Sequence, residues 1–148
     1  MFIVNRRAAV TMSSVGLVSA AVAPILSFAT PALAEIPVYG PNDGKELSPG
    51  VRWVDLGEVE SQIDAYKKVM FGDAIYEPGA QDPWNQPVMD TDMFCYILQG
   101  DFEITKKGIP PYMVKQGQAY TCGKGKIDNG HNVSKVVGIM RVSMLMPA

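Results

Sequence analysis

The residue best suited to chemistry near neutral pH is His131, the only histidine among the 148 residues of the chain. An imidazole titrates close to neutral pH, so His131 could act as a general acid or base, with Asp128 orienting its ring. The alternative interpretation is a solvated loop histidine beside Gly130. A single imidazole also excludes any site that needs two histidine ligands.

Sulfur-bearing side chains form a second group of candidates. The two cysteines, Cys95 and Cys122, are too few for a disulfide-rich scaffold or for a zinc site built from cysteines. Methionine fills irregular gaps in a core, which is one interpretation of the later methionines, and a soft pocket for an apolar ligand or for copper(I) is the other. These methionines are Met70, Met89, Met93, Met113, Met140, Met144 and Met146.

The first 34 residues have the pattern of a secretory signal peptide. Arg6 and Arg7 precede 27 uncharged residues that end in Ala32-Leu33-Ala34, an Ala-x-Ala cleavage pattern. The arginine pair resembles a twin-arginine export signal, and an uncleaved membrane anchor is the alternative. We therefore expect a periplasmic or secreted protein, cleaved after Ala34. Two of the 13 basic residues lie in this segment and all 15 acidic ones follow it, so the mature chain has a formal net charge of −4.

The remaining chain predicts an all-β fold. Residues 35–64 are an extended lead-in with a first strand at 51–56, and residues 58–65 are the only stretch spaced for a helical turn or two. Residues 65–148 carry short apolar segments between Gly and Pro turns, as in a sandwich or barrel. We expect strands at 67–76, 93–98, 102–105, 112–114, 118–122 and within 133–146.

Two connecting segments carry alternatives of their own. Residues 81–92, with Asp82, Asp90, Asp92 and Trp84, are polar and form either a lid over a ligand or a solvated rim. The dipeptide Asn129-Gly130 is typical of a hairpin turn.

Three stretches, Ile75–Ala80, Phe94–Ile104 and Gly117–Gly125, resemble sequence motifs of the single-domain cupins. The first is similar to the strand end and Pro-Gly turn that open motif 1. The second is similar to the hydrophobic strand, glycine turn and return strand that close it, and the third to the glycine-led start of motif 2. The resemblance implies a cupin-like double-stranded β-helix, or jelly-roll barrel, with a pocket in its mouth.

The resemblance also implies where metal ligands would stand. Metal-binding cupins place two histidines and a glutamate in motif 1 and one histidine in motif 2, where this sequence has Pro87, Met89, Met93 and Asp128. Thioethers are poor ligands for iron, zinc or manganese, so we expect no metal and no other cofactor, and no metal-dependent dioxygenase chemistry. If Asn129-Gly130 is a hairpin turn, His131 rather than Asp128 begins the next strand.

In a cupin jelly roll, the strands that contain Cys95 and Cys122 lie side by side. In an oxidising compartment this implies a disulfide between them, which would enclose 26 residues and stabilise the fold by roughly 3 kcal/mol. Two buried free thiols are the alternative.

The function that these observations favour is an exported, metal-free cupin-like protein that binds a small organic molecule or acts as an accessory protein. Its pocket would be lined by Met89, Met93, Cys95 and Tyr96, with Asp128 and His131 as polar groups. The alternatives are a metal-independent lyase, isomerase or cyclase that uses His131, and a periplasmic interaction subunit. The expected partner is a small ligand, with a homodimer as a candidate. The acidity of the mature chain disfavours nucleic acid and anionic membranes as partners. Cleavage of the signal segment would leave no stable membrane anchor.

Overall fold

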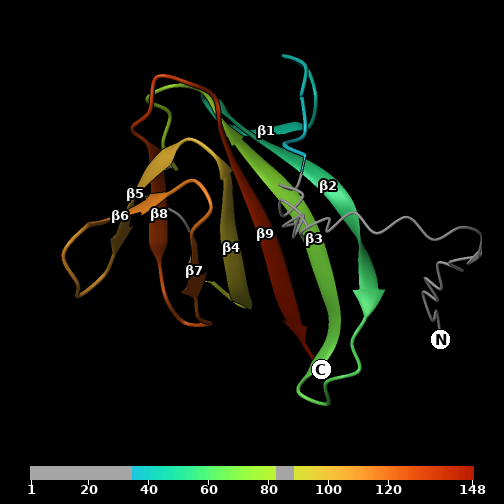
Figure 1. Ribbon diagram of the computed structural model, residues 1–148. Coiled ribbons are helices and arrows are strands. Elements are labelled where there is room, and N and C mark those ends of the chain that lie inside the picture. The colour runs from blue at the N-terminus through green and yellow to red at the C-terminus, as the bar shows by residue number, and fades with distance from the viewer. Residues whose placement is uncertain (1–34, 83–88) are drawn as a thin grey trace, which may run out of the picture. The chain divides into compact units, whose positions relative to one another are not determined.

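Two antiparallel sheets form the part of the chain that the computed structural model describes, residues 35–82 and 89–148 (Figure 1). The larger sheet has the strand order β1-β2-β3-β9-β4-β7, and the smaller has the order β6-β5-β8. The strands are β1 (Lys45–Ser48), β2 (Val51–Glu60), β3 (Tyr66–Tyr76), β4 (Asp92–Gln99), β5 (Asp101–Lys106), β6 (Tyr112–Lys115), β7 (Ala119–Cys122), β8 (Asp128–Asn132) and β9 (Gly138–Pro147). These two stretches contain no helix, and so none that could span a membrane. The predicted all-β fold is confirmed.

The predicted helical turn at 58–65 is wrong, because β2 continues to Glu60. A bulge between Asp55 and Gly57 shifts the register, and Gly57 supports it with a φ of 102°. Beyond the bulge, Gly57 to Glu60 pair with Phe71 to Lys68 of β3. A long partner strand thus overrides a weak helical spacing.

The predicted hairpin turn at Asn129-Gly130 is also wrong. Both residues lie inside β8, where Asn129 pairs with Thr105 and Gly130 with Ile104 of β5. A turn of this kind needs a positive φ, which Gly130 does not have. Asp128, rather than His131, therefore begins the strand.

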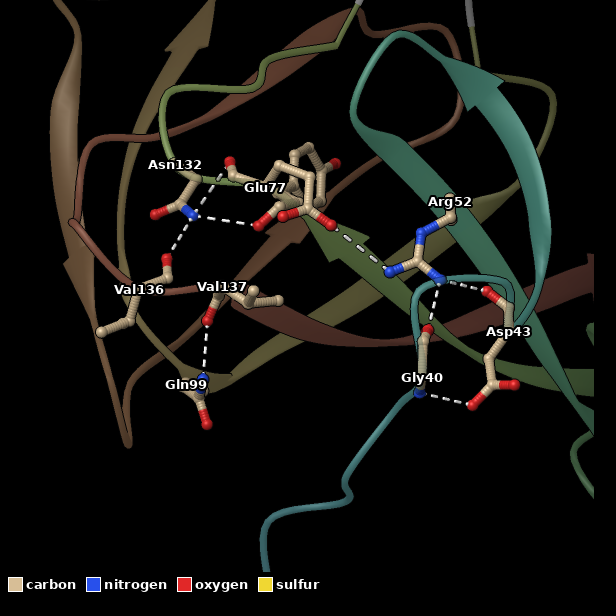
Figure 2. A network of polar contacts seen from close by, with 9 residues as sticks. Gly40, Asp43, Arg52, Glu77, Gln99, Asn132, Val136 and Val137 are labelled. Carbon is tan, nitrogen blue, oxygen red and sulfur yellow. Dashed lines mark hydrogen bonds and ion pairs between the residues drawn. The ribbon is translucent and has the colours of Figure 1, made fainter.

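The predicted lead-in contributes two strands to the larger sheet and also packs on its outer face. Arg52 of β2 donates to the carbonyls of Gly40, at 2.8 Å, and Asp43, at 2.6 Å (Figure 2). Tyr39 donates to the Asp73 carboxylate of β3 at 2.6 Å. Residues 35–148 form one compact unit, which begins at the residue after the predicted cleavage position.

The core lies between the two sheets. The larger sheet contributes inward residues such as Tyr76 and Ile97, and the smaller contributes Phe102, Ile104 and Val114. The rings of Tyr76 and Phe102 meet edge to face, with 5.0 Å between centroids. At one end of the core, the buried Asn132 amide donates to the carbonyls of Tyr76, Glu77 and Val136, which ties β8 to the end of β3 (Figure 2).

Candidate functional site

A cavity of about 350 Å³ opens on the inner face of the larger sheet. Strand alternation explains its walls, because directly paired residues of neighbouring strands point to the same face. Trp53 pairs with Ala74, and Ala74 with Met140, in one such row. The residues that line the cavity are Leu47, Trp53, Ala74, Tyr76, Asp82, Met89, Met93, Cys95, Tyr120, Asp128, Met140, Val142 and Met144.

A glycine makes room for the aromatic wall of the cavity. Gly72 of β3 lies beneath the ring of Trp53, and a Cβ on this glycine would fall 1.9 Å from the Trp53 ring. Any larger residue at this position would displace the ring. The missing side chain at Gly72 thus makes the space that the Trp53 indole occupies on the inner face of the sheet.

One polar group of the cavity is the buried Tyr76 hydroxyl, which donates to Asp82. The distances to the two carboxylate oxygens are 3.0 and 3.1 Å, and the Gly130 backbone N–H donates to Asp82 at 2.8 Å. Burial, reinforced by the Asp82 charge, raises the pKa of Tyr76 well above its ordinary value. Tyr76 therefore stays a neutral hydrogen-bond donor.

The second polar group is the Asp128 carboxyl, which is only 5% exposed. Its Oδ2 atom has no hydrogen-bond partner among the residues that the structure describes. Burial raises the pKa of Asp128, while the hydrogen bond with the Cys122 thiol and the charge of Lys106 lower it. A buried acceptor without a donor is unfavourable, and a ligand in the cavity could supply one.

Tyr120 and Lys106 border this carboxyl. The Tyr120 hydroxyl lies 3.4 Å from the Met140 sulfur, and burial raises the pKa of Tyr120 well above its ordinary value. The Lys106 ammonium lies 5.0 Å from the centroid of the Tyr120 ring and donates to the carbonyl of Thr121. Lys106 is not among the lining residues of the cavity.

Four of the six predicted ligand-binding residues line the cavity together: Met89, Met93, Cys95 and Asp128. Tyr96 does not, because it alternates with Cys95 on β4 and is 39% exposed on the outer face. His131 does not either, because it alternates with Gly130 and pairs with Glu103 on the outward face of the smaller sheet. The structure therefore does not bring His131 and Asp128 into one site.

The sequence interpretation missed several lining residues that alternation in the neighbouring strands could have indicated. Trp53, Tyr76 and Tyr120 are aromatic residues at inward positions of β2, β3 and β7. Asp82, predicted only as part of a lid or rim, lines the cavity. Trp84 and Pro87, from the same loop, lie outside the described residues.

The predicted disulfide is not formed, and both cysteines are buried free thiols. The strand register explains this, because Cys95 lies opposite Tyr120 and Cys122 lies opposite Met93. The cysteines are therefore diagonal neighbours, and each thiol has another partner: Tyr120 for Cys95 and Asp128 for Cys122. Burial raises the pKa of both thiols to about 12, which favours the protonated thiol at neutral pH.

The donor set does not fit the metal ions that the cupin resemblance implies. Of the four positions, Met89, Met93 and Asp128 line the cavity and Pro87 lies outside the described residues. This leaves one carboxylate and two thioethers, where iron, zinc or manganese prefers imidazole and carboxylate. Within residues 35–82 and 89–148, no three His, Cys, Asp or Glu residues are grouped to hold a metal ion.

Comparison with solved structures identifies the fold. A RmlC-like cupin from Shewanella frigidimarina matches with a TM-score of 0.54 and 15% identity over 78% of this chain and 93% of its own. KdgF from Halomonas sp. matches with a TM-score of 0.53 and 14% identity, over 70% and 86% of the two chains. The Cupin_2 domain of an XRE-family transcriptional regulator from Enterobacter cloacae matches with 0.54 and 13%, over 67% and 99%.

These similarities show that the described part of the chain, residues 35–82 and 89–148, has the cupin fold, a jelly-roll barrel of antiparallel strands. The sequence identities carry no information about function. No protein-family model matches the chain, and none of the curated proteins matches it either.

Proposed function

We propose that the protein binds a small organic molecule with a mainly apolar body in the inner cavity, without a metal ion. The observation that carries the proposal is the cavity itself. Its volume of about 350 Å³ lies within the range of ligand pockets, which are commonly apolar with a few polar groups. Tightly packed interiors leave few spaces larger than a water molecule.

The chemistry of the walls supports binding rather than turnover. Four methionines, Met89, Met93, Met140 and Met144, offer flexible, polarisable contacts to an apolar body. The Tyr76 hydroxyl is engaged by Asp82, whereas the Asp128 Oδ2 atom is left as an acceptor. His131, the residue on which acid–base catalysis would rest, faces away from the cavity.

Export is part of the same proposal. The support is the sequence of residues 1–34, with its arginine pair and Ala-x-Ala end. Mass spectrometry of the protein recovered from the periplasm and the medium tests it. A mature N-terminus at Glu35 is expected, and full-length protein confined to the cytoplasm would contradict this part.

A fluorescent probe tests ligand binding directly. N-phenyl-1-naphthylamine is uncharged, mainly apolar and emits strongly when it leaves water, so the purified mature chain is expected to enhance its emission saturably. Ala74→Leu adds three carbon atoms at the wall and should weaken the affinity by about tenfold or more. Ser143→Leu, on the outward side of β9, is the matched control and should leave affinity unchanged.

The outcome that would contradict the proposal is equally definite. If Ala74→Leu melts as cooperatively as the parent and binds the probe equally well, the probe does not occupy the cavity. If the parent binds neither this probe nor the ligands of the next subsection, the cavity is not a binding site.

A further inference from the structure

Among the residues that the structure describes, every charged side chain that lines the inner cavity is acidic. Asp82 and Asp128 are these residues, and the described lining contains no lysine, arginine or histidine. An anionic ligand would therefore meet like charges in a region of low dielectric constant, where repulsion is strong. A cationic group would meet favourable charges from both.

The two carboxyl groups differ in the hydrogen-bond donors that they already have. The oxygens of Asp82 already accept from the Tyr76 hydroxyl and the Gly130 N–H. The Oδ2 atom of Asp128 lacks a donor among the described residues, although Asp128 is 95% buried and faces the cavity. A carboxylate buried this way is stabilised most by a cation that also donates a hydrogen bond.

Aromatic rings surround the same space. Trp53, Tyr76 and Tyr120 line the cavity from β2, β3 and β7. The face of an aromatic ring attracts an organic cation by about 0.5–2 kcal/mol, the more so where water is excluded. The rings and the methionines can also make apolar contacts with the hydrocarbon part of such a cation.

Lys106 is the internal cation whose charge reaches Asp128. Its ammonium is engaged by the Thr121 carbonyl and lies over the Tyr120 ring, and it does not form an ion pair with Asp128. Lys106 is the direct cross-strand partner of Asp128, so the two side chains point to the same face of the smaller sheet. Because the Lys106 ammonium is engaged by the Thr121 carbonyl instead, the Asp128 Oδ2 atom is left without a donor among the described residues.

We propose that the ligand of the inner cavity is a small organic ammonium, whose N–H donates to Asp128 Oδ2 while its hydrocarbon body contacts the aromatic rings and methionines. This inference rests on the proposed function and specifies the class of ligand. A primary or secondary amine on an aromatic or branched aliphatic group fits the available volume of about 350 Å³.

Three probes that differ in one group test the charge. Phenethylammonium, 2-phenylethanol and phenylacetate share a phenyl ring and a short linker, and carry a cation, a neutral hydroxyl and an anion. Isothermal titration of the mature chain at neutral pH should show phenethylammonium binding about tenfold or more tighter than 2-phenylethanol. Phenylacetate should bind more weakly than either.

The Asp128→Asn variant assigns the preference to the proposed atom. It should bring the affinity for phenethylammonium down to that for 2-phenylethanol, and leave the alcohol within about twofold of the parent. Glu103→Gln, on the outward face of the smaller sheet, removes one negative charge elsewhere and should change neither affinity.

A second pair of variants adds a positive charge at the entrance of the cavity or away from it. Both substitutions are at exposed positions, which tolerate a change of side chain. Leu47 lines the cavity and is 55% exposed, so Leu47→Lys places a cation at its entrance and should weaken phenethylammonium alone. Leu56 is 45% exposed and does not line the cavity, so Leu56→Lys is the matched control.

The outcomes separate the two proposals. Equal binding of the amine and the alcohol, or an amine preference that Asp128→Asn leaves intact, would overturn the ammonium inference and leave ligand binding standing. Preferential binding of phenylacetate would overturn it as well. Failure of all three probes together with N-phenyl-1-naphthylamine would overturn both.

Discussion

Two buried carboxylates lie on opposite sides of the larger sheet, Asp73 on the outer face and Asp128 beside the cavity of the inner face. They differ in their hydrogen-bond partners. On the outer face, fully buried Asp73 receives Arg141 Nε at 2.9 Å, Arg141 Nη2 at 2.8 Å and the Tyr39 hydroxyl at 2.6 Å. In the cavity, Asp128 of β8 has a hydrogen bond with the Cys122 thiol and an Oδ2 atom with no partner in the described residues.

The difference separates a structural carboxylate from one suited to a ligand. A buried charge is tolerated when it is paired and hydrogen-bonded, and Asp73 satisfies both conditions with groups from the lead-in and β9. Asp128 satisfies them only in part, and it faces a cavity. Substitutions at Arg141, Tyr39 and Asp128 test this contrast, and one at Gly72 tests the packing of the inner face.

The largest effect on stability is expected when the ion pair between Arg141 and Asp73 is broken. Arg141→Leu leaves the Asp73 charge buried without its cation and should lower the free energy of unfolding by about 3 kcal/mol. This is the low end of the range for broken buried pairs, because the Arg141 side chain is 41% exposed. Urea denaturation followed by circular dichroism measures it.

The double variant Asp73→Leu/Arg141→Leu controls for the loss of the arginine itself. It should be more stable than Arg141→Leu alone, since no unpaired charge remains buried. A single variant as stable as the parent would show that Asp73 does not depend on Arg141.

The next effect concerns the inner face. Gly72→Ala places a methyl group against the Trp53 ring and should destabilise the protein by about 1–3 kcal/mol through overpacking. It should also shift the Trp53 emission, read in a Trp84→Phe background. Gly123→Ala is the control, because the nearest atom to its new Cβ lies at 3.6 Å. An unchanged emission would mean that the ring does not lie on Gly72.

The strands of this fold were largely predictable from sequence, whereas β8 was not. The apolar segments 67–76 and 93–98 predicted β3 and β4 closely, because alternation and glycine turns are signals that local sequence carries. Asn129-Gly130 carries an equally clear local signal for a turn. Pairing with β5 outweighs this signal, and that pairing depends on residues more than 20 positions away.

The part of the site that was predictable came from the cupin resemblance. Its motif positions indicated Met89, Met93 and Asp128, and all three line the cavity. Tyr96 was assigned to the same wall, although consecutive residues of a strand face opposite sides. Tyr76 and Trp53 join the cavity through the strand register, which sequence alone does not give.

A smaller effect is expected from the second donor to Asp73. Burial and the Asp73 carboxylate raise the pKa of Tyr39 to about 12, so its hydroxyl is a neutral donor throughout the usual pH range. Tyr39→Phe removes this hydrogen bond and should lower the free energy of unfolding by about 1–2 kcal/mol. Tyr96→Phe, on the same outer face, should cost less. Equal losses would indicate that Tyr39 contributes packing only.

The smallest expected effect on the free energy of unfolding is an increase rather than a decrease. Asp128→Asn removes a charge that burial disfavours, so at about pH 7 the variant should be slightly more stable than the parent. The same change at Asp73 removes the partner of Arg141 and should lower stability at that pH. Urea denaturation of the two variants compares the signs directly.

The pH dependence of stability shows whether the charge of Asp128 causes the difference between the Asp128→Asn variant and the parent. Because the folded pKa of Asp128 is raised above its ordinary value of 3.8, the parent binds more protons when folded than when unfolded. The stability contributed by this protonated group is therefore complete below pH 3.8 and declines as the pH rises through the folded pKa. Asp128→Asn should match the parent in acid and gain on it up to neutral pH, whereas a difference independent of pH would assign the effect to packing instead.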